Sequence, residues 1–88
     1  MTHLTITTYL RQYASAFNLH WAEPLVNKAS DDAVCLEWWR GDRKLTIYIE
    51  DGKAEVLRVW GTNPDTEMAN EIISTLSELE ALWGWLVA

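Results

Sequence analysis

Residues 35–68 read CLEWWRGDRKLTIYIEDGKAEVLRVWGTNPDTEM and carry the clearest fold signals of the chain. Three runs rich in branched and aromatic side chains, 33–39, 44–50 and 54–60, are separated by Arg40-Gly41-Asp42-Arg43 and by Asp51-Gly52. A two-residue Asp-Gly loop is a strong hairpin signal, because a type I′ turn needs positive φ at both central residues. The pattern predicts an antiparallel meander of three strands.

The two turns also predict the register of the strands. The Asp-Gly turn pairs Ile49 with Ala54, and the first turn sets the second register if it pairs Trp39 with Lys44. Both hairpins then place the same apolar side chains on one face of the sheet. These are Val34, Leu36, Trp38, Leu45, Ile47, Ile49, Ala54 and Val56.

Arg58 conflicts with this pattern, because the register puts it on the apolar face beside Leu45. A bulge near 56–57 would turn Arg58 toward solvent. Alternatively, its guanidinium lies over Trp38 in a cation–π contact. The sequence leaves both arrangements open.

The N-terminal segment has the periodicity of an amphipathic helix over about 5–18. Its apolar stripe consists of Ile6, Leu10, Tyr13 and Phe17. Asn18 can end this helix. The residues 19–30, with Pro24 inside, read as an extended connector in which Leu25-Val26 can form a short fourth strand at a sheet edge.

The C-terminal segment predicts a second helix that begins after Gly61. Thr62-Asn63-Pro64-Asp65 offers an N-cap, a proline at the first helical position and an acid in the first turn. A break at 74–77 and a second capping box at 77–80 are compatible with the pattern, and Gly84 weakens the last turn. The expected stripe is Met68, Ile72, Leu76, Leu79, Trp83 and Leu86.

Together these elements predict a single α+β domain over residues 1–88, in the order α-β-β-β-α, with the two helices packed on the sheet.

The chain has 88 residues and a net charge of −6, from thirteen acidic and seven basic side chains. Such a charge opposes binding to nucleic acid, whose affinity comes from Lys and Arg. After Val59 there is no Lys or Arg. The electric field of this acidic segment can orient a charged protein partner. Any solvated acidic helix has the same composition. The five carboxylates of this segment are Asp65, Glu67, Glu71, Glu78 and Glu80.

No catalytic or metal-binding constellation is visible. The two histidines, His3 and His20, are isolated, and metal sites need clustered ligands. The single Cys35 cannot form an internal disulfide. The sequence therefore predicts no enzyme, no cofactor and no metal. It also shows neither a signal peptide nor a membrane span, so we expect a cytoplasmic protein that does not associate with a membrane.

The second sheet face mixes apolar and polar groups, namely Cys35, Glu37, Trp39, Lys44, Thr46, Tyr48, Glu55, Leu57 and Val59. In one interpretation a helix or the connector covers it. In the other, Trp39 and Tyr48 with nearby arginines form an exposed anchor patch, since Trp, Tyr and Arg dominate binding hot spots. Trp83 and Trp85 are two apart on a helix, so we expect one of them to be exposed or to meet another chain. The candidate protein-binding residues are Trp39, Arg40, Arg43, Tyr48, Arg58 and Trp85.

About a third of the chain is covered by a Glu-Trp strand, a basic turn, a second strand of the LTIYI kind and a Trp-Gly before Glu-Met. In these features the chain resembles a group of small, uncharacterised bacterial and phage-borne proteins. The matching residues are Glu37, Trp38, Arg43, Leu45, Trp60, Gly61, Glu67 and Met68. The resemblance implies a bacterial or phage origin and brings no activity with it.

The sequence favours a non-enzymatic protein-binding module, such as an inhibitor, an antitoxin or an immunity-type modulator. The reasons are its small size, its acidity, its many aromatic side chains and the lack of a visible catalytic or metal-binding constellation. An alternative is a homo-oligomeric structural domain, for instance a homodimer that closes the second sheet face, or a small-molecule-binding domain. A weaker alternative is a nucleic-acid mimic that uses the acidic C-terminal segment.

Overall fold

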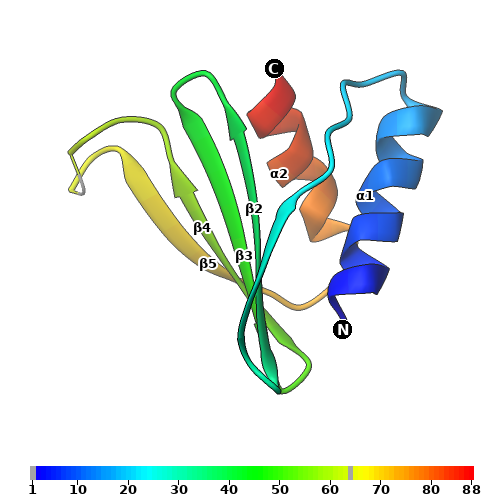
Figure 1. The fold of residues 1–88 in the computed structure, drawn as a ribbon. Helices are drawn as coiled ribbons and strands as arrows, with labels where there is room; N and C mark the ends of the chain where they lie inside the picture. Colours follow the sequence, from blue (N-terminus) through cyan, green and yellow to red (C-terminus); the bar gives the residue numbers. More distant parts are fainter. Residues whose placement is uncertain (1, 64) are drawn as a thin grey trace.

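The computed structural model describes residues 2–63 and 65–88, which form two helices and a five-stranded sheet (Figure 1). The helices are α1 (His3–Ala16) and α2 (Glu78–Val87). The strands are β1 (Leu25–Ser30), β2 (Ala33–Arg40), β3 (Arg43–Glu50), β4 (Lys53–Val59) and β5 (Met68–Ile73). The α+β class is therefore confirmed, but the sheet has five strands where the sequence predicted three and a short fourth.

The strands follow one another in the order β1-β2-β3-β4-β5, and every neighbouring pair is antiparallel. Both helices lie on the same side of this meander, which leaves the other side of the sheet without a helix (Figure 1). We call these two sides the helix face and the open face. The fold is thus two layers, helices on sheet, and its core lies between them.

The predicted register of the central hairpins is confirmed. Ile49 is paired with both Val34 and Ala54, and Trp39 is paired with Lys44. Asp51 and Gly52 have φ of 51° and 73°, the positive values that a type I′ turn requires. At the first turn only Gly41, with φ of 61°, is positive, as in a type II′ turn. Local turn chemistry therefore sets the strand alignment, as expected.

Arg58 keeps the regular register opposite Leu45, so the alternative with a bulge near 56–57 is wrong. Its side chain lies on the helix face, where Nη2 is 2.9 Å from Glu71 Oε1 and the guanidinium is 5.4 Å from the ring centroid of Trp85. A cation–π contact forms, but on Trp85 and not on Trp38. The charge is tolerated here because β5 supplies a carboxylate directly beside it.

The predicted helix start at 62–65 is wrong, because residues 68–73 form strand β5; Pro64 lies outside the described residues. The run MANEII alternates between the two faces, and β4 offers it a complete ladder of backbone partners. Met68 and Ile72 are consequently exposed on the open face. Of the five carboxylates after Val59, only Glu78 and Glu80 belong to a helix, so the predicted acidic helix is reduced to one short element.

Helix α2 begins at the second predicted capping box. Ser77 occupies the N-cap without a side-chain cap, and the carboxylate of Glu78 instead accepts hydrogen bonds from Ser74 N at 3.3 Å and Thr75 Oγ1 at 3.3 Å. Four of its side chains are buried, namely Leu79, Leu82, Trp83 and Leu86. The later half of the predicted stripe is therefore correct.

Helix α1 agrees with the sequence prediction apart from its ends. Ile6 and Leu10 are fully buried, and Asn18, with φ of 55°, follows the C-terminus of the helix. Phe17 was expected in the core but is 66% exposed and contacts Tyr13 at 4.9 Å between ring centroids. Ala14 takes the buried position one turn beyond Leu10. After a short extended stretch, β1 confirms the edge strand proposed at Leu25-Val26.

The hydrophobic core joins α1, α2 and the helix face of the sheet. Its members from the sheet are Leu36, Trp38, Leu45, Ile47, Ile49, Ala54, Val56 and Ile73. Trp83 is the largest fully buried side chain and lies against both Trp38 and Trp21. Within the described residues, no helix is long and apolar enough to cross a membrane.

Candidate protein-binding surface

The open face is formed by alternate residues of all five strands, in three rows across the sheet. The rows are Trp39-Lys44-Val59-Met68, then Leu25-Glu37-Thr46-Leu57-Asn70, then Asn27-Cys35-Tyr48-Glu55-Ile72. No described helix packs on this side of the sheet (Figure 1). The described residues therefore do not show the alternative arrangement, in which a helix or the connector covers this face.

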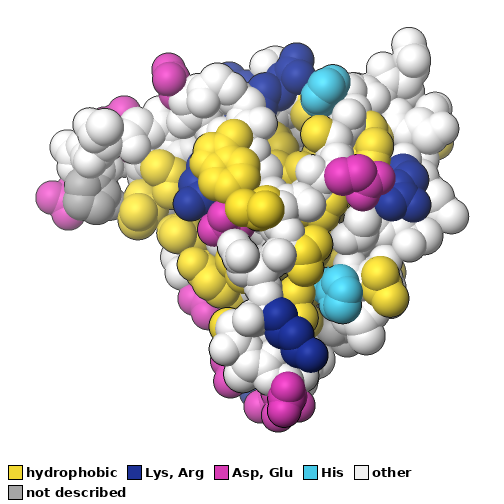
Figure 2. Space-filling view, in the orientation of Figure 1, with side chains coloured by type: hydrophobic (Ala, Val, Ile, Leu, Met, Phe, Trp, Pro, Cys, Tyr) yellow, Lys and Arg dark blue, Asp and Glu magenta, His cyan; other side chains and the backbone are white. Residues whose placement is uncertain are grey.

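Exposed apolar side chains are concentrated on the open face. Eight large hydrophobic side chains are exposed among the described residues, and five of them lie here. They are Leu25, Trp39, Tyr48, Met68 and Ile72. Figure 2 shows hydrophobic side chains along the strand side that faces away from the helices, between acidic groups at the outer loops. Along the rows of the sheet, Lys44 and Glu55 stand between these side chains, so the face combines exposed apolar groups with polar ones, as interaction sites do.

Charged groups on the open face have polar or charged partners beside them. Lys44 Nζ lies 3.6 Å from Glu37 Oε1 and 5.3 Å from the ring centroid of Trp39. On the other side of the face, Asn70 Nδ2 donates to Glu55 Oε1 at 2.8 Å. Because these partners are already in place, covering the face with another apolar surface would bury few unpaired charges.

Two polar groups lie near the middle of the face, and both are buried. Thr46 is 1% exposed, and its Oγ1 has no hydrogen-bond partner among the described residues. Burial raises the pKa of the Cys35 thiol, and the nearby carboxylate of Glu37 raises it further. A thiol that stays protonated is a poor nucleophile, so Cys35 acts here as a small packing group.

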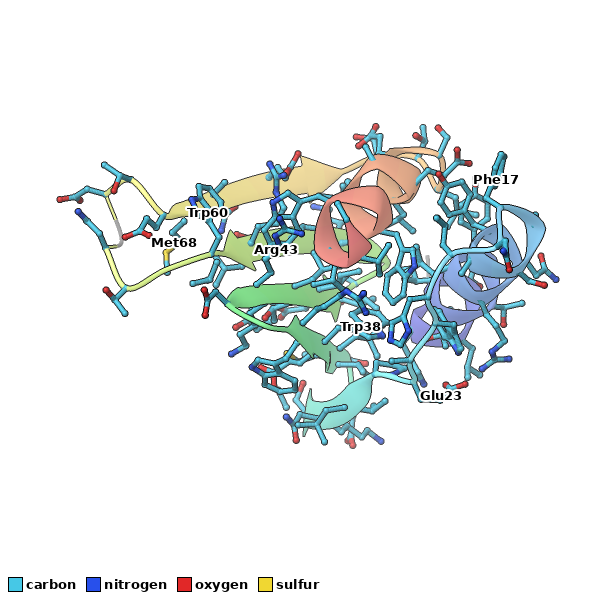
Figure 3. All side chains as sticks on the ribbon, turned by 90° about the horizontal axis from the view of Figure 1, so that it is seen from above. Phe17, Glu23, Trp38, Arg43, Trp60 and Met68 are labelled. Carbon is cyan, nitrogen blue, oxygen red and sulfur yellow. The ribbon has the colours of Figure 1, made fainter. Side chains whose placement is uncertain are left out.

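A second aromatic cluster lies on the helix face, around Trp85. The guanidinium groups of Arg43 and Arg58 are 5.9 Å and 5.4 Å from its ring centroid, and Trp60 meets it edge-on at 6.1 Å. Arg43 Nη1 also donates to the backbone oxygens of Trp85 at 3.0 Å and Ala88 at 2.9 Å. Figure 3 shows Arg43 and Trp60 near helix α2. Arg43 therefore binds the C-terminal turn of α2 to the sheet.

The six predicted binding residues do not form one patch. Trp39, at 54% exposed, and Tyr48, at 46%, lie on the open face, and Arg40 is exposed at the end of β2. Arg43, Arg58 and Trp85 belong to the cluster around Trp85 on the other side of the sheet. Trp83 is buried and Trp85 is half-buried.

Sequence reasoning missed three exposed apolar members of the open face, namely Leu25, Met68 and Ile72. Met68 and Ile72 had been assigned to a helical stripe because they are four residues apart. The alternation of apolar and polar residues in MANEII was the signal that could have identified them as strand residues.

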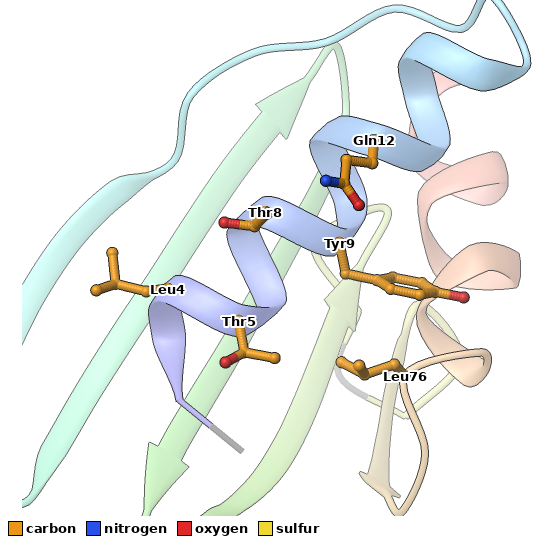
Figure 4. A pocket seen from close by; sticks show the side chains of 6 residues that line it. All are labelled: Leu4, Thr5, Thr8, Tyr9, Gln12 and Leu76. Carbon is orange, nitrogen blue, oxygen red and sulfur yellow. The ribbon is translucent and has the colours of Figure 1, made fainter.

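The hollows of the surface are shallow. One, of about 420 Å³, lies along α1 and is lined by Leu4, Thr5, Thr8, Tyr9, Gln12 and Leu76 (Figure 4). Beside it the Tyr9 hydroxyl donates to the Glu80 carboxylate and links the two helices. Among the described residues, no group of three or more His, Cys, Asp or Glu side chains could hold a metal ion.

Comparisons with protein-family models, with curated proteins and with solved structures found no match to this chain.

Proposed function

We propose that this chain is a non-enzymatic protein-binding module that contacts its partner through the open face of the sheet. The observation that carries the proposal is the gathering of five exposed apolar side chains on this one face. Trp39 and Tyr48 are the proposed anchors, because aromatic side chains bury much area at little entropic cost.

The size of the open face suits a protein partner. With strands about 4.8 Å apart and a rise of about 3.3 Å per residue, five strands of six residues cover roughly 480 Å². This is of the same order as the ~800 Å² that each partner contributes to an ordinary specific interface. A small ligand would need a concave site, whereas the anchors here stand on a sheet surface.

The charge of the chain favours a basic partner. A net charge of −6 on 88 residues attracts a positively charged surface over a distance of about one Debye length and speeds association. The charged groups of the open face already have partners, which lowers the cost of covering them with another surface. We assign the module to the cytoplasm and to the class of inhibitor, antitoxin or immunity-type modulators of bacterial or phage origin.

The test is capture of a partner by the immobilised full chain from a bacterial lysate, at low and at high salt, with variants as the deciding comparison. Trp39→Ala and Tyr48→Ala should each remove the captured protein from the eluate. Phe17→Ala is the matched control, because Phe17 is an aromatic residue at the end of α1 that is even more exposed than Trp39 and Tyr48.

The proposal requires a protein that is retained by the wild type and by Phe17→Ala and lost with the open-face variants. If all four proteins retain the same set of lysate components, or if Phe17→Ala removes the partner as well, the open face is not the binding surface.

A further inference from the structure

The two edges of the sheet differ in how they are protected against pairing with another strand. Edge strand β1 has a register irregularity between Lys28 and Ser30, and Lys28 lies on its helix face. A bulge and an inward-directed lysine are devices that block edge pairing. In β5 the pairing with β4 is regular from Met68 to Ile73, and its inward-directed Glu71 is held by Arg58. The outer edge of β5 is the unprotected one.

The phase of the hydrogen-bond ladder follows from the Asp51-Gly52 turn. In a two-residue hairpin the flanking pair, Glu50 and Lys53, is hydrogen-bonded, and hydrogen-bonded pairs then alternate along the ladder. Residues 54, 56 and 58 of β4 therefore direct their backbone groups toward β5. The hydrogen bond from Trp60 N to Glu67 O, at 3.0 Å, continues this phase.

It follows that residues 69, 71 and 73 of β5 direct their backbone N–H and C=O groups toward β4. Met68, Asn70 and Ile72 direct their N–H and C=O groups to the free edge. Their side chains lie on the open face, where Met68 and Ile72 are exposed. An incoming strand would thus meet three free donor–acceptor pairs and two apolar side chains.

The sequence of β5 is complementary to itself about Asn70. We propose that the partner of this edge is a second copy of the chain, whose β5 pairs antiparallel with the first across a two-fold axis at Asn70. Met68 then lies opposite Ile72 of the second copy, and Ile72 opposite its Met68. The two Asn70 residues face each other, so all three outward-facing residues of each strand complete their backbone hydrogen bonds.

Neighbouring registers are less favourable. A two-fold axis at Glu71 places two glutamates opposite each other, and like charges in a cross-strand pair are destabilising. It also pairs Asn70 with Ile72, so amide and apolar groups no longer match. An odd shift is excluded because it would place residues of one face opposite residues of the other.

The resulting dimer is a continuous ten-stranded sheet in which both pairs of helices lie on one side. The two open faces become one surface, with a stripe of Met68 and Ile72 side chains at its centre. This dimer does not depend on the proposed partner of the open face, since it uses backbone groups at the edge of the sheet and not Trp39 or Tyr48.

The test is the molar mass of the full chain by sedimentation equilibrium over a dilution series from about 1 μM to about 500 μM. The wild type should pass from monomer to dimer within this range. Asn70→Pro removes an outward-facing N–H, which edge strands tolerate, and should weaken the dimer at least about tenfold. Ile72→Lys should do the same by placing a charge opposite Met68.

Leu25→Lys is the matched control for Ile72→Lys, because Leu25 is an exposed aliphatic residue of the same face on the opposite edge strand. This variant should dimerise like the wild type. A wild type that remains monomeric up to the highest concentration would overturn the proposal. So would equal weakening by both lysine variants, which would indicate face-to-face packing.

Circular dichroism establishes that each variant is folded. Should Asn70→Pro lose its fold, Ile72→Lys against Leu25→Lys decides alone, because both side chains are exposed. Loss of lysate capture with Trp39→Ala while dimerisation persists separates this inference from the proposed function.

Discussion

Trp83 of α2 packs edge-on against Trp38 of β2, with ring centroids 5.5 Å apart and an angle of 80° between the planes. Each indole N–H also donates to a backbone oxygen of the connector between α1 and β1. Trp38 Nε1 bonds to Ala22 O at 2.9 Å, and Trp83 Nε1 bonds to His20 O at 3.0 Å. A segment without helix or strand is thus held by two core tryptophans, which also satisfy their own buried polar atoms.

Trp83→Phe should destabilise the fold by about 1–3 kcal/mol, because it removes this hydrogen bond and leaves a void beside Trp38 and Trp21. The measurement is the free energy of unfolding from urea titration. Trp39→Phe is the matched control and should change it by less than about 0.5 kcal/mol, since Trp39 is exposed. Equal effects of the two substitutions would contradict the assigned burial.

Arg43→Ala should lower the free energy of unfolding by about 1–2 kcal/mol, because two backbone oxygens at the C-terminal end of α2, those of Trp85 and the C-cap Ala88, lose a charged donor. Amide hydrogen exchange should accelerate in the last turn of α2 more than in the strands. Arg40→Ala changes the other arginine that flanks the same turn and should leave α2 protection as in the wild type. Uniform acceleration in both variants would mean that Arg43 does not hold the helix.

Gly84→Ala and Gly41→Ala should act in opposite directions. Gly84 lies within α2, and a Cβ there meets nothing within 4 Å, so alanine should stabilise the protein by about 0.4–1 kcal/mol. A Cβ at Gly41 also has space, but φ of 61° makes alanine cost about 1–2 kcal/mol. Thermal unfolding of both variants checks the signs, and a stabilising Gly41→Ala would contradict the positive φ.

The pKa of Tyr9 is raised above its usual value, first by the hydrogen bond that its hydroxyl donates to Glu80, then by burial and by the negative charge of that carboxylate. Ionisation of Tyr9 removes the donor and places two negative charges together. The contribution of this contact to stability is therefore complete below the ordinary tyrosine pKa and is lost as the pH rises through the raised value.

An alkaline absorbance titration of the tyrosines should accordingly contain a late component that disappears in Tyr9→Phe. Tyr48→Phe is the control, because Tyr48 lies on the open face, and it should retain the late component. A Tyr9→Phe protein whose titration still ends in the same late step would show that the Glu80 contact does not control Tyr9.

The sequence predicted the central part of the sheet correctly, and it failed where two periodicities coincide. In MANEII, Met68 and Ile72 are spaced like one face of a helix and also like alternate residues of a strand. A helix start signal at 62–65 favoured the first interpretation. Only the free edge of β4, with backbone groups that residues 69, 71 and 73 can bond, selects the strand.

The candidate site was also predicted only in part. Trp39 and Tyr48 were placed on the open face because the register of two hairpins fixes which side chains share a side. Arg43 and Arg58 were grouped with them by residue type, although the register already gave Arg58 the opposite face. Their actual neighbour, Trp85, comes from a helix far along the chain, and no local pattern contains that contact.

The sequence alone determined where the three central strands lie, to within one residue at each end, together with both hairpin turns and the faces of these strands. These features depend on φ preferences and on a period of two along a short segment. Tertiary structure alone decided that residues 68–73 form a strand and that both helices lie on one face. It also decided that Arg58 can be accommodated against Trp85 and Glu71. These outcomes depend on which distant segments of the chain bury one another. The hydrophobic effect is non-directional, so a local sequence pattern does not specify which segments meet.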